Sequence, residues 1–146
     1  MSPANRADPC ASPNIALGKS VTASGNSAES PASAAVDGTI WTLWNSGGPP
    51  RGWIEVDLGA EHDLTFLRLG VPQTPAGRAV HKVWGKSAVP GAPYVELQEI
   101  DRSTADGEIV EVAPGMPWVG IRYLRIETIW GPSWPAWREI EVFSAP

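Results

Sequence analysis

Three oxygen-bearing residues, Asp37, Thr39 and Thr42, lie within six positions of one another in the sequence. The glycine that follows Asp37 accepts the positive φ angle that a tight turn requires. A carboxylate, a backbone carbonyl and a hydroxyl gathered in such a turn suit Ca²⁺, because this cation takes about 6–8 oxygen ligands. A structural interpretation fits the same residues: Asp37 holds the turn through nearby backbone N–H groups, while Trp41 and Trp44 fill the core.

The composition is typical of one globular domain with a net negative charge. At 146 residues, with 42% hydrophobic and 18% charged residues, the chain is long enough to bury a core. The net charge of −5 argues against nucleic acid or an anionic membrane as the main partner, because both attract basic surfaces. No apolar run approaches the roughly 20 residues of a membrane span.

Residues 1–13 are expected to be a leader or linker that precedes a single domain over 14–146. The leader is small, polar and interrupted by proline. It lacks the apolar stretch of a signal peptide, so the chain is either intracellular or has lost its signal. Cys10 is the only cysteine, so it has no partner for a disulfide within the chain and says nothing about the redox compartment.

Glycine and proline punctuate the whole chain and predict short strands. The 15 glycines and 15 prolines leave no interval longer than 94–106 free of both, so there is little room for a long helix. Alternation of apolar and polar residues in Trp53–Leu58 and Glu139–Phe143 is typical of half-buried strands. The other expected strands are Ser20–Ser24, Leu64–Leu69, His81–Ser87, Tyr94–Ile100, Glu108–Val112 and Ile121–Ile129. About eight short strands at regular spacing predict an antiparallel sandwich or barrel.

Five segments follow one another in a recognisable order and cover most of the chain. They are NIALGKSVTAS (Asn14–Ser24), AVDGTIWTLWNS (Ala35–Ser46), WIEVDLG (Trp53–Gly59), IRYLRIE (Ile121–Glu127) and WREIEVF (Trp137–Phe143). With these segments in register, the chain resembles the discoidin family, the coagulation-factor type-C domains and the related carbohydrate-binding module family 32. The resemblance implies a galactose-binding-domain-like jelly-roll β-sandwich, with a structural Ca²⁺ site and a ligand site on variable loops.

The resemblance also implies a set of metal ligands. They are the carbonyls of Ala34, Thr39 and Arg138, the hydroxyl of Thr42, and the carboxylates of Asp37 and Glu139. Glu139 sits at the mouth of the closing strand, where its side chain can bend back into a loop, although Glu141 is a rival from the residues alone. Two carboxylates balance the charge of Ca²⁺, and an ion that joins the turn at Asp37 to the last strand would stabilise the fold.

The expected ligand site lies on the loops, because a sugar needs an aromatic platform together with polar groups for its hydroxyls. Trp130 or Trp134 is the expected platform, whereas Trp137 is expected to plug the end of the sandwich. The expected polar groups are Asn45, Arg51, Arg78 and His81. In galactose-binding members of family 32, a His, an Arg, an Asn and an aromatic do this work. Their one-to-one counterparts are not evident here, so the sugar is not predicted.

Each ligand candidate also has a structural interpretation. His81 heads an apolar strand and fits a surface or edge histidine, and Arg78 fits a solvated loop side chain. Trp134 fits a plug for the sandwich end. These alternatives stay open at the level of the sequence.

Catalysis is not expected. The chain has no Gly-x-Ser-x-Gly elbow and no His-Glu-x-x-His motif, and only His62 and His81 could act as histidine bases. Glu55 and Asp57 share one strand face, where like charges mark a solvated surface more often than a glycosidase pair.

The expected function is therefore that of a non-catalytic carbohydrate-binding module, attached to a larger secreted or cell-surface protein that it targets to a glycan. The alternative is a discoidin-type adhesion domain that binds a protein or a phospholipid surface. The acidic balance favours sugar over lipid.

Overall fold

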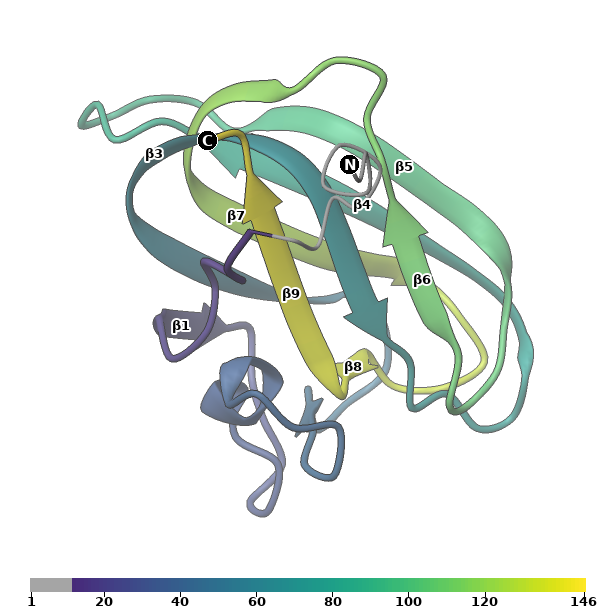
Figure 1. Ribbon diagram of the computed structural model, residues 1–146. Helices are drawn as coiled ribbons and strands as arrows, with labels where there is room; N and C mark the ends of the chain where they lie inside the picture. The colour runs from purple at the N-terminus through teal and green to yellow at the C-terminus, as the bar shows by residue number, and fades with distance from the viewer. Residues whose placement is uncertain (1–11) are drawn as a thin grey trace.

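Strand β3 (Gly52–Gly70) is the element that joins the two layers of the molecule (Figure 1). The computed structural model describes residues 12–146, so Cys10 and most of the expected leader lie outside the described residues. The first half of β3 pairs with β1 (Ser20–Ala23) and β7 (Trp118–Trp130). Its second half pairs with β6 (Ile109–Val112) and β9 (Glu139–Ser144). All these pairings are antiparallel, which confirms the expected antiparallel sandwich.

The β1–β3–β7 layer is extended by two further strands. These are β4 (Gly77–Lys86), which pairs with β7, and β5 (Val95–Thr104), which pairs with β4. Alternate side chains of the strands point inward and form one core, in which Ile54, Leu67 and Ile126 are at most 1% exposed. Burial of such side chains supplies most of the favourable free energy of folding.

The sequence divided β3 into two strands at Gly59, and this boundary is wrong. The strand continues past Gly59, which has a φ of +86°, and the register of its pairing with β7 shifts between Asp57, His62 and Leu64. Bulges of this kind bend a strand and increase its twist. The bend lets one strand take part in both layers.

Three short elements have no counterpart among the expected strands. They are the 3-10 helix η2 (Ala32–Val36) and the two-residue strands β2 (Trp44–Asn45) and β8 (Ala136–Trp137). The strands β2 and β8 pair with each other, and both tryptophans of the pair are buried, as expected for Trp44 and Trp137. Within residues 12–146, no helix is long and apolar enough to cross a membrane.

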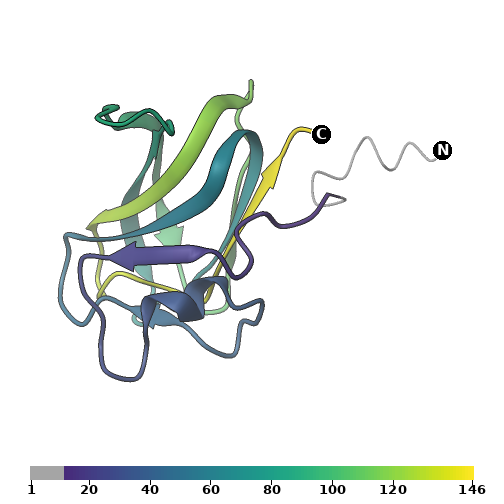
Figure 2. The same ribbon diagram turned by 90° about the vertical axis from the view of Figure 1, so that its left-hand side faces the viewer.

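The loops that carry the candidate site residues gather at one end of the sandwich. The segment from β1 to β3, which contains η2, lies at this end together with the β7–β8 loop, as Figures 1 and 2 show from two directions. The C-terminus and the β6–β7 loop lie at the opposite end. The sandwich therefore presents a cluster of loops at one end.

Candidate functional site

The carboxylates of Asp37 and Glu139 meet at the loop end of the sandwich, although they lie far apart in the sequence. Asp37 follows η2 directly, and Glu139 begins β9. Glu139 Oε2 accepts a hydrogen bond from the backbone N–H of Gly38 at 2.9 Å. Asp37 accepts hydrogen bonds from the Thr39 N–H and from the Thr42 hydroxyl. The early turn is therefore joined to the last strand through a carboxylate.

Glu139 is a buried acid with one unpartnered oxygen. The residue is 5% exposed, and its Oε1 atom has no hydrogen-bond partner. Burial, with the neighbouring Asp37 carboxylate as a further cause, raises the pKa of Glu139 to about 8. A buried charge without a partner is costly. A divalent cation shared by the two carboxylates would remove that cost, so these residues fit a hard cation.

The remaining predicted metal ligands flank the same two carboxylates. Ala34 is buried in η2, and Arg138 directly precedes β9. The Arg138 guanidinium donates to the carbonyl of Ile40 at 3.1 Å and pairs with Asp106 at 2.9 Å, so its side chain clamps the loop. Among residues 12–146, no group of three or more His, Cys, Asp or Glu side chains is placed so that it could hold a metal ion. A cation here would therefore depend on carbonyls and hydroxyls, such as those of Ala34, Thr39 and Thr42, for its other ligands.

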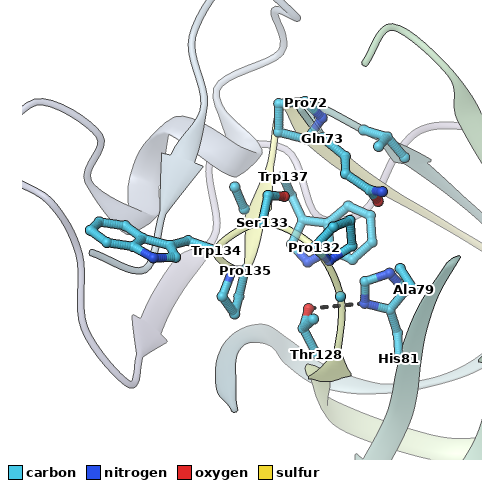
Figure 3. A pocket seen from close by; sticks show the side chains of 13 residues that line it. Pro72, Gln73, Ala79, His81, Thr128, Pro132, Ser133, Trp134, Pro135 and Trp137 are labelled. Atoms are coloured by element: carbon cyan, nitrogen blue, oxygen red, sulfur yellow. Dashed lines mark hydrogen bonds between the residues drawn. The ribbon is translucent and has the colours of Figure 1, made fainter. Parts of the chain in front are cut away.

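Trp134 lies in the β7–β8 loop and is 49% exposed. The loop is fixed next to it, because the Pro135 carbonyl accepts a hydrogen bond from the Ser46 N–H at 2.8 Å. Asn45 lies on β2, which pairs with β8 directly after the loop. In Figure 3, the indole of Trp134 points away from the cavity and from Trp137. The loop is thus anchored next to an exposed aromatic ring, and Asn45 pairs with Ala136, two residues after Trp134.

His81 lies beneath this loop, in contrast to the expectation that it faces a ligand. It is 8% exposed, and its Nδ1 shares a hydrogen bond of 2.9 Å with Thr128 Oγ1. Its ring centroid lies 4.8 Å from that of Trp137. The cavity that His81 lines has a volume of about 20 Å³, which is room for about one water molecule (Figure 3). A sugar on Trp134 therefore has to lie on the outer face of the indole.

The other polar candidates are exposed but already paired. Arg51 lies 3.3 Å from a carboxylate oxygen of Glu127. Arg78 donates two hydrogen bonds of 2.9 Å to Asp101, which lower the pKa of Asp101 and raise that of Arg78. Exposed pairs of this kind contribute about 0–1 kcal/mol each, so sugar hydroxyls can compete for the guanidinium groups. Trp130, the last residue of β7, is 61% exposed and pairs with Val80 of β4, the strand that carries Arg78.

Glu55 and Asp57, the carboxylates that share one strand face, are each bound by an arginine of β7. Arg125 lies 2.9 Å from Glu55 and stacks over the ring of Trp53 at 3.7 Å. Arg122 binds Asp57 through two hydrogen bonds, which lower the pKa of that carboxyl. The two acids therefore serve cross-strand pairing on the outer face of the sheet.

Sequence reasoning missed Gln73 and left Trp41 undecided. The Gln73 amide is buried and donates to the carbonyls of Gly77 and Thr104, at 2.9 and 3.1 Å, which fixes the loop between β3 and β4. A single glutamine in a proline-rich loop carries no signal for such a role. Trp41 could be assigned either to the core or to the surface from the sequence, and in the structure it is 85% exposed in the loop between η2 and β2.

His81→Asn is expected to flatten the pH dependence of stability between pH 4 and pH 6.5. Burial lowers the pKa of His81 from 6.5 to about 4. In this interval the unfolded chain binds a proton that the folded protein does not bind. The wild type therefore loses stability as the pH falls below 6.5, by up to about 1.4 kcal/mol per pH unit, and the loss ends near the folded pKa.

Urea unfolding of the wild type and the variant at matched pH values measures this difference. His62→Asn is the matched control, because it removes the other histidine and leaves His81 in place. Identical pH slopes for His81→Asn and the wild type would contradict the assignment of His81 as a buried, neutral side chain.

A model of the F5/8 type C domain family matches residues 20–140. The chain belongs to this family. The match extends from the first residue of β1 into β9 and includes both the Asp37 turn and the Trp134 loop. It confirms the resemblance inferred from the five sequence segments. The comparison with curated proteins gives no match.

Solved structures of carbohydrate-binding modules share the fold of this F5/8 type C domain. The family 32 module of Clostridium perfringens NanJ, in complex with galactose, has a TM-score of 0.73 and 17% identity, over 87% of this chain and 94% of that chain. Chitosan-binding module 1 of a chitosanase/glucanase from Paenibacillus sp. IK-5 has a TM-score of 0.71 and 26% identity, over 90% and 98%. These similarities confirm the jelly-roll sandwich.

A third similar structure is a much longer protein. A family 89 glycoside hydrolase from Clostridium perfringens matches with a TM-score of 0.75 and 23% identity, over 91% of this chain but 15% of that chain. In that enzyme, the fold of the F5/8 type C domain is one part of a larger chain.

Proposed function

We propose that this F5/8 type C domain is a non-catalytic carbohydrate-binding module that stacks a sugar ring on Trp134. The observation that carries the proposal is the half-exposed indole on a loop that β2 and β8 hold rigid. A pre-ordered aromatic surface binds a sugar face with little loss of conformational entropy. Asn45 and Arg51, on the adjoining segment, are the nearest candidates for binding the sugar hydroxyls. The similarity to modules that bind galactose and chitosan supports this ligand class.

A structural Ca²⁺ ion is the second part of the proposal. Asp37 and Glu139 would supply the carboxylates, and the hydroxyl of Thr42 with the carbonyls of Ala34, Thr39 and Arg138 would complete the set. The support is the unpartnered Oε1 of Glu139 in a buried position beside a second acid. The ion would hold the Asp37 turn against β9, and its role would be stability.

We further propose that the module works outside the cell or at its surface, attached to a larger protein that it directs to a glycan. The support for attachment to a larger protein is the Clostridium perfringens glycoside hydrolase, in which the matching part is a small share of the chain. The acidic charge of −5 suits a neutral or amino-sugar polymer better than an anionic lipid surface.

A glycan array probed with the labelled protein tests the ligand class. We expect binding to a small group of glycans, with a dissociation constant on the order of 0.1–1 mM for a single sugar, because a shallow platform buries little area. Vesicles with and without phosphatidylserine form the second arm. Binding to the vesicles without binding to any glycan would overturn the proposal in favour of membrane adhesion.

A further inference from the structure

We propose that Trp41 is a second sugar platform, separate from Trp134, for neutral or amino hexopyranose units of a glycan chain. The inference rests on the proposed carbohydrate-binding function and adds a second binding position to it. It starts from the exposure of Trp41, which at 85% is the greatest among the exposed large hydrophobic side chains of residues 12–146.

Trp41 lies at the rim of two hollows. One, of about 650 Å³, extends over η2, and its lining includes Glu29 together with the proposed metal ligands Asp37 and Thr42. The other, of about 360 Å³, lies beside Gly70 and Glu108. Volumes of roughly 300–1,000 Å³ are typical of small-ligand pockets, so either hollow has room for a sugar ring against the indole. The cavity under Trp134, by contrast, has room for about one water molecule.

The loop that carries Trp41 is held in place on both sides. The Trp41 N–H donates to the Thr39 hydroxyl at 3.1 Å, and the Ile40 carbonyl accepts from Arg138 at 3.1 Å. Arg138 is itself fixed by Asp106 at 2.9 Å. A ligand on this indole would therefore bind a largely pre-ordered surface, which lowers the entropic cost of binding.

The surroundings of Trp41 suit a sugar better than a lipid. Ile40 and Ile109 are partly exposed beside it, so the apolar area continues past the indole. Charged side chains of both signs line the hollows: Glu29 and Asp37 with Lys19 in one, and Glu108 with Arg138 in the other. Mixed apolar and polar groups match the CH face and the hydroxyls of a pyranose. The two signs nearly balance, which favours a neutral sugar over an anionic headgroup, and the exposed Glu29 carboxylate can also pair with the ammonium group of an amino sugar.

Two platforms at one end of the sandwich make binding to a polymer bivalent. The segments that carry Trp41 and Trp134 both lie at the loop end (Figure 1). A second contact on the same polymer raises the apparent affinity through effective concentration, by a factor that can reach about 10²–10⁴. We therefore expect each platform alone to retain the protein on a polysaccharide much less well than both together.

Retention on chitosan beads and on insoluble galactan tests the second platform. In calcium-containing buffer, we expect Trp41→Ala to lower the apparent affinity for the retaining polymer at least about 10-fold, with an unchanged melting temperature. Trp134→Ala is expected to cause a comparable loss. Met116→Ala is the matched control, because it removes a side chain that is 78% exposed in the β6–β7 loop, at the other end of the molecule.

The outcomes separate this inference from the function on which it rests. If the wild type binds neither polymer nor any glycan of the array, the proposed function itself fails. If the wild type is retained and Trp41→Ala is retained equally well, only the second platform is overturned. A loss for Met116→Ala as large as that for Trp41→Ala would also overturn it, because the effect would not be specific to the loop end.

Discussion

Glu139→Gln is expected to lower the melting temperature by roughly 10 °C in excess calcium, yet to leave it unchanged or raised in EDTA. A cation at about 100 times its dissociation constant stabilises the folded state by about 2.7 kcal/mol, and each kcal/mol shifts the melting temperature of a domain of this size by roughly 3–4 °C. Loss of one of the two carboxylates removes most of this stabilisation. We therefore expect Glu139→Gln to destabilise the protein only in the presence of calcium.

The reversal follows from the environment of Glu139. Without a cation, the wild type buries a carboxyl group whose Oε1 has no partner, next to the Asp37 carboxylate. The amide of glutamine carries no charge, and its oxygen can still accept the hydrogen bond from Gly38 that now reaches Oε2 at 2.9 Å. Because burial raises the pKa of Glu139 to about 8, the carboxyl is largely protonated at neutral pH without a cation, and glutamine is a neutral side chain of the same shape. The exchange is therefore expected to keep the stability of the metal-free fold or to raise it.

Thermal melts in calcium and in EDTA measure this effect, and Glu141→Gln is the matched control. Glu141 lies on the same strand, pairs with Arg68 at 3.3 Å and makes the same change in net charge when replaced. It is expected to keep the full calcium dependence. If calcium raised the melting temperature of Glu139→Gln as much as that of the wild type, the proposed cation site would be wrong.

Trp134→Ala is expected to weaken glycan binding about 10- to 100-fold, which corresponds to roughly 1.4–2.7 kcal/mol, while the protein stays folded. The stacking surface is lost, but the loop keeps its anchors at Pro135 and in the β2–β8 pair. At 49% exposure, the indole contributes little to the core. Titration of the strongest array glycan, together with a thermal melt, measures both quantities.

Two other tryptophans serve as controls for Trp134. Trp137→Ala is expected to cost about 3–5 kcal/mol of stability, because Trp137 is 1% exposed. Trp130→Ala, at an exposed position on β7, is expected to have a smaller effect on binding than Trp134→Ala. If Trp134→Ala unfolds the protein, Trp134 is a core residue and the platform assignment is wrong.

Most strands could be predicted from the sequence, because the alternation of apolar and polar residues along a strand shows which side chains are buried. The closing strand was predicted as Glu139–Phe143 and is Glu139–Ser144. The pair β2–β8 was not predicted, since two residues carry no periodicity and pair only because the core holds Trp44 against Trp137. Continuity of β3 through Gly59 likewise depends on strands that pair with it on both sides.

The candidate site was accessible only in part. The turn at Asp37 has a local signal, but its meeting with Glu139 depends on the topology of the whole sandwich, so the residues alone left metal and turn as alternatives. His81 had a usable signal: it alternates with Ala79 and Val83, both buried, and therefore faces the core. The exposure of Trp41 had no signal in the sequence. The loop around it lacks a regular alternation of apolar and polar residues, which would show which side chains face solvent.

The central claim is that exposed indoles at the loop end of the sandwich bind a glycan. The most direct measurement is an NMR titration of the wild type with the strongest array glycan in calcium, in which the indole N–H signals are assigned through single Trp→Phe variants. The claim predicts shifts for Trp134 and Trp41 and none for the buried Trp44 and Trp137. Shifts confined to Trp53 and Trp84, which lie on the outer face of the sheet, would contradict it.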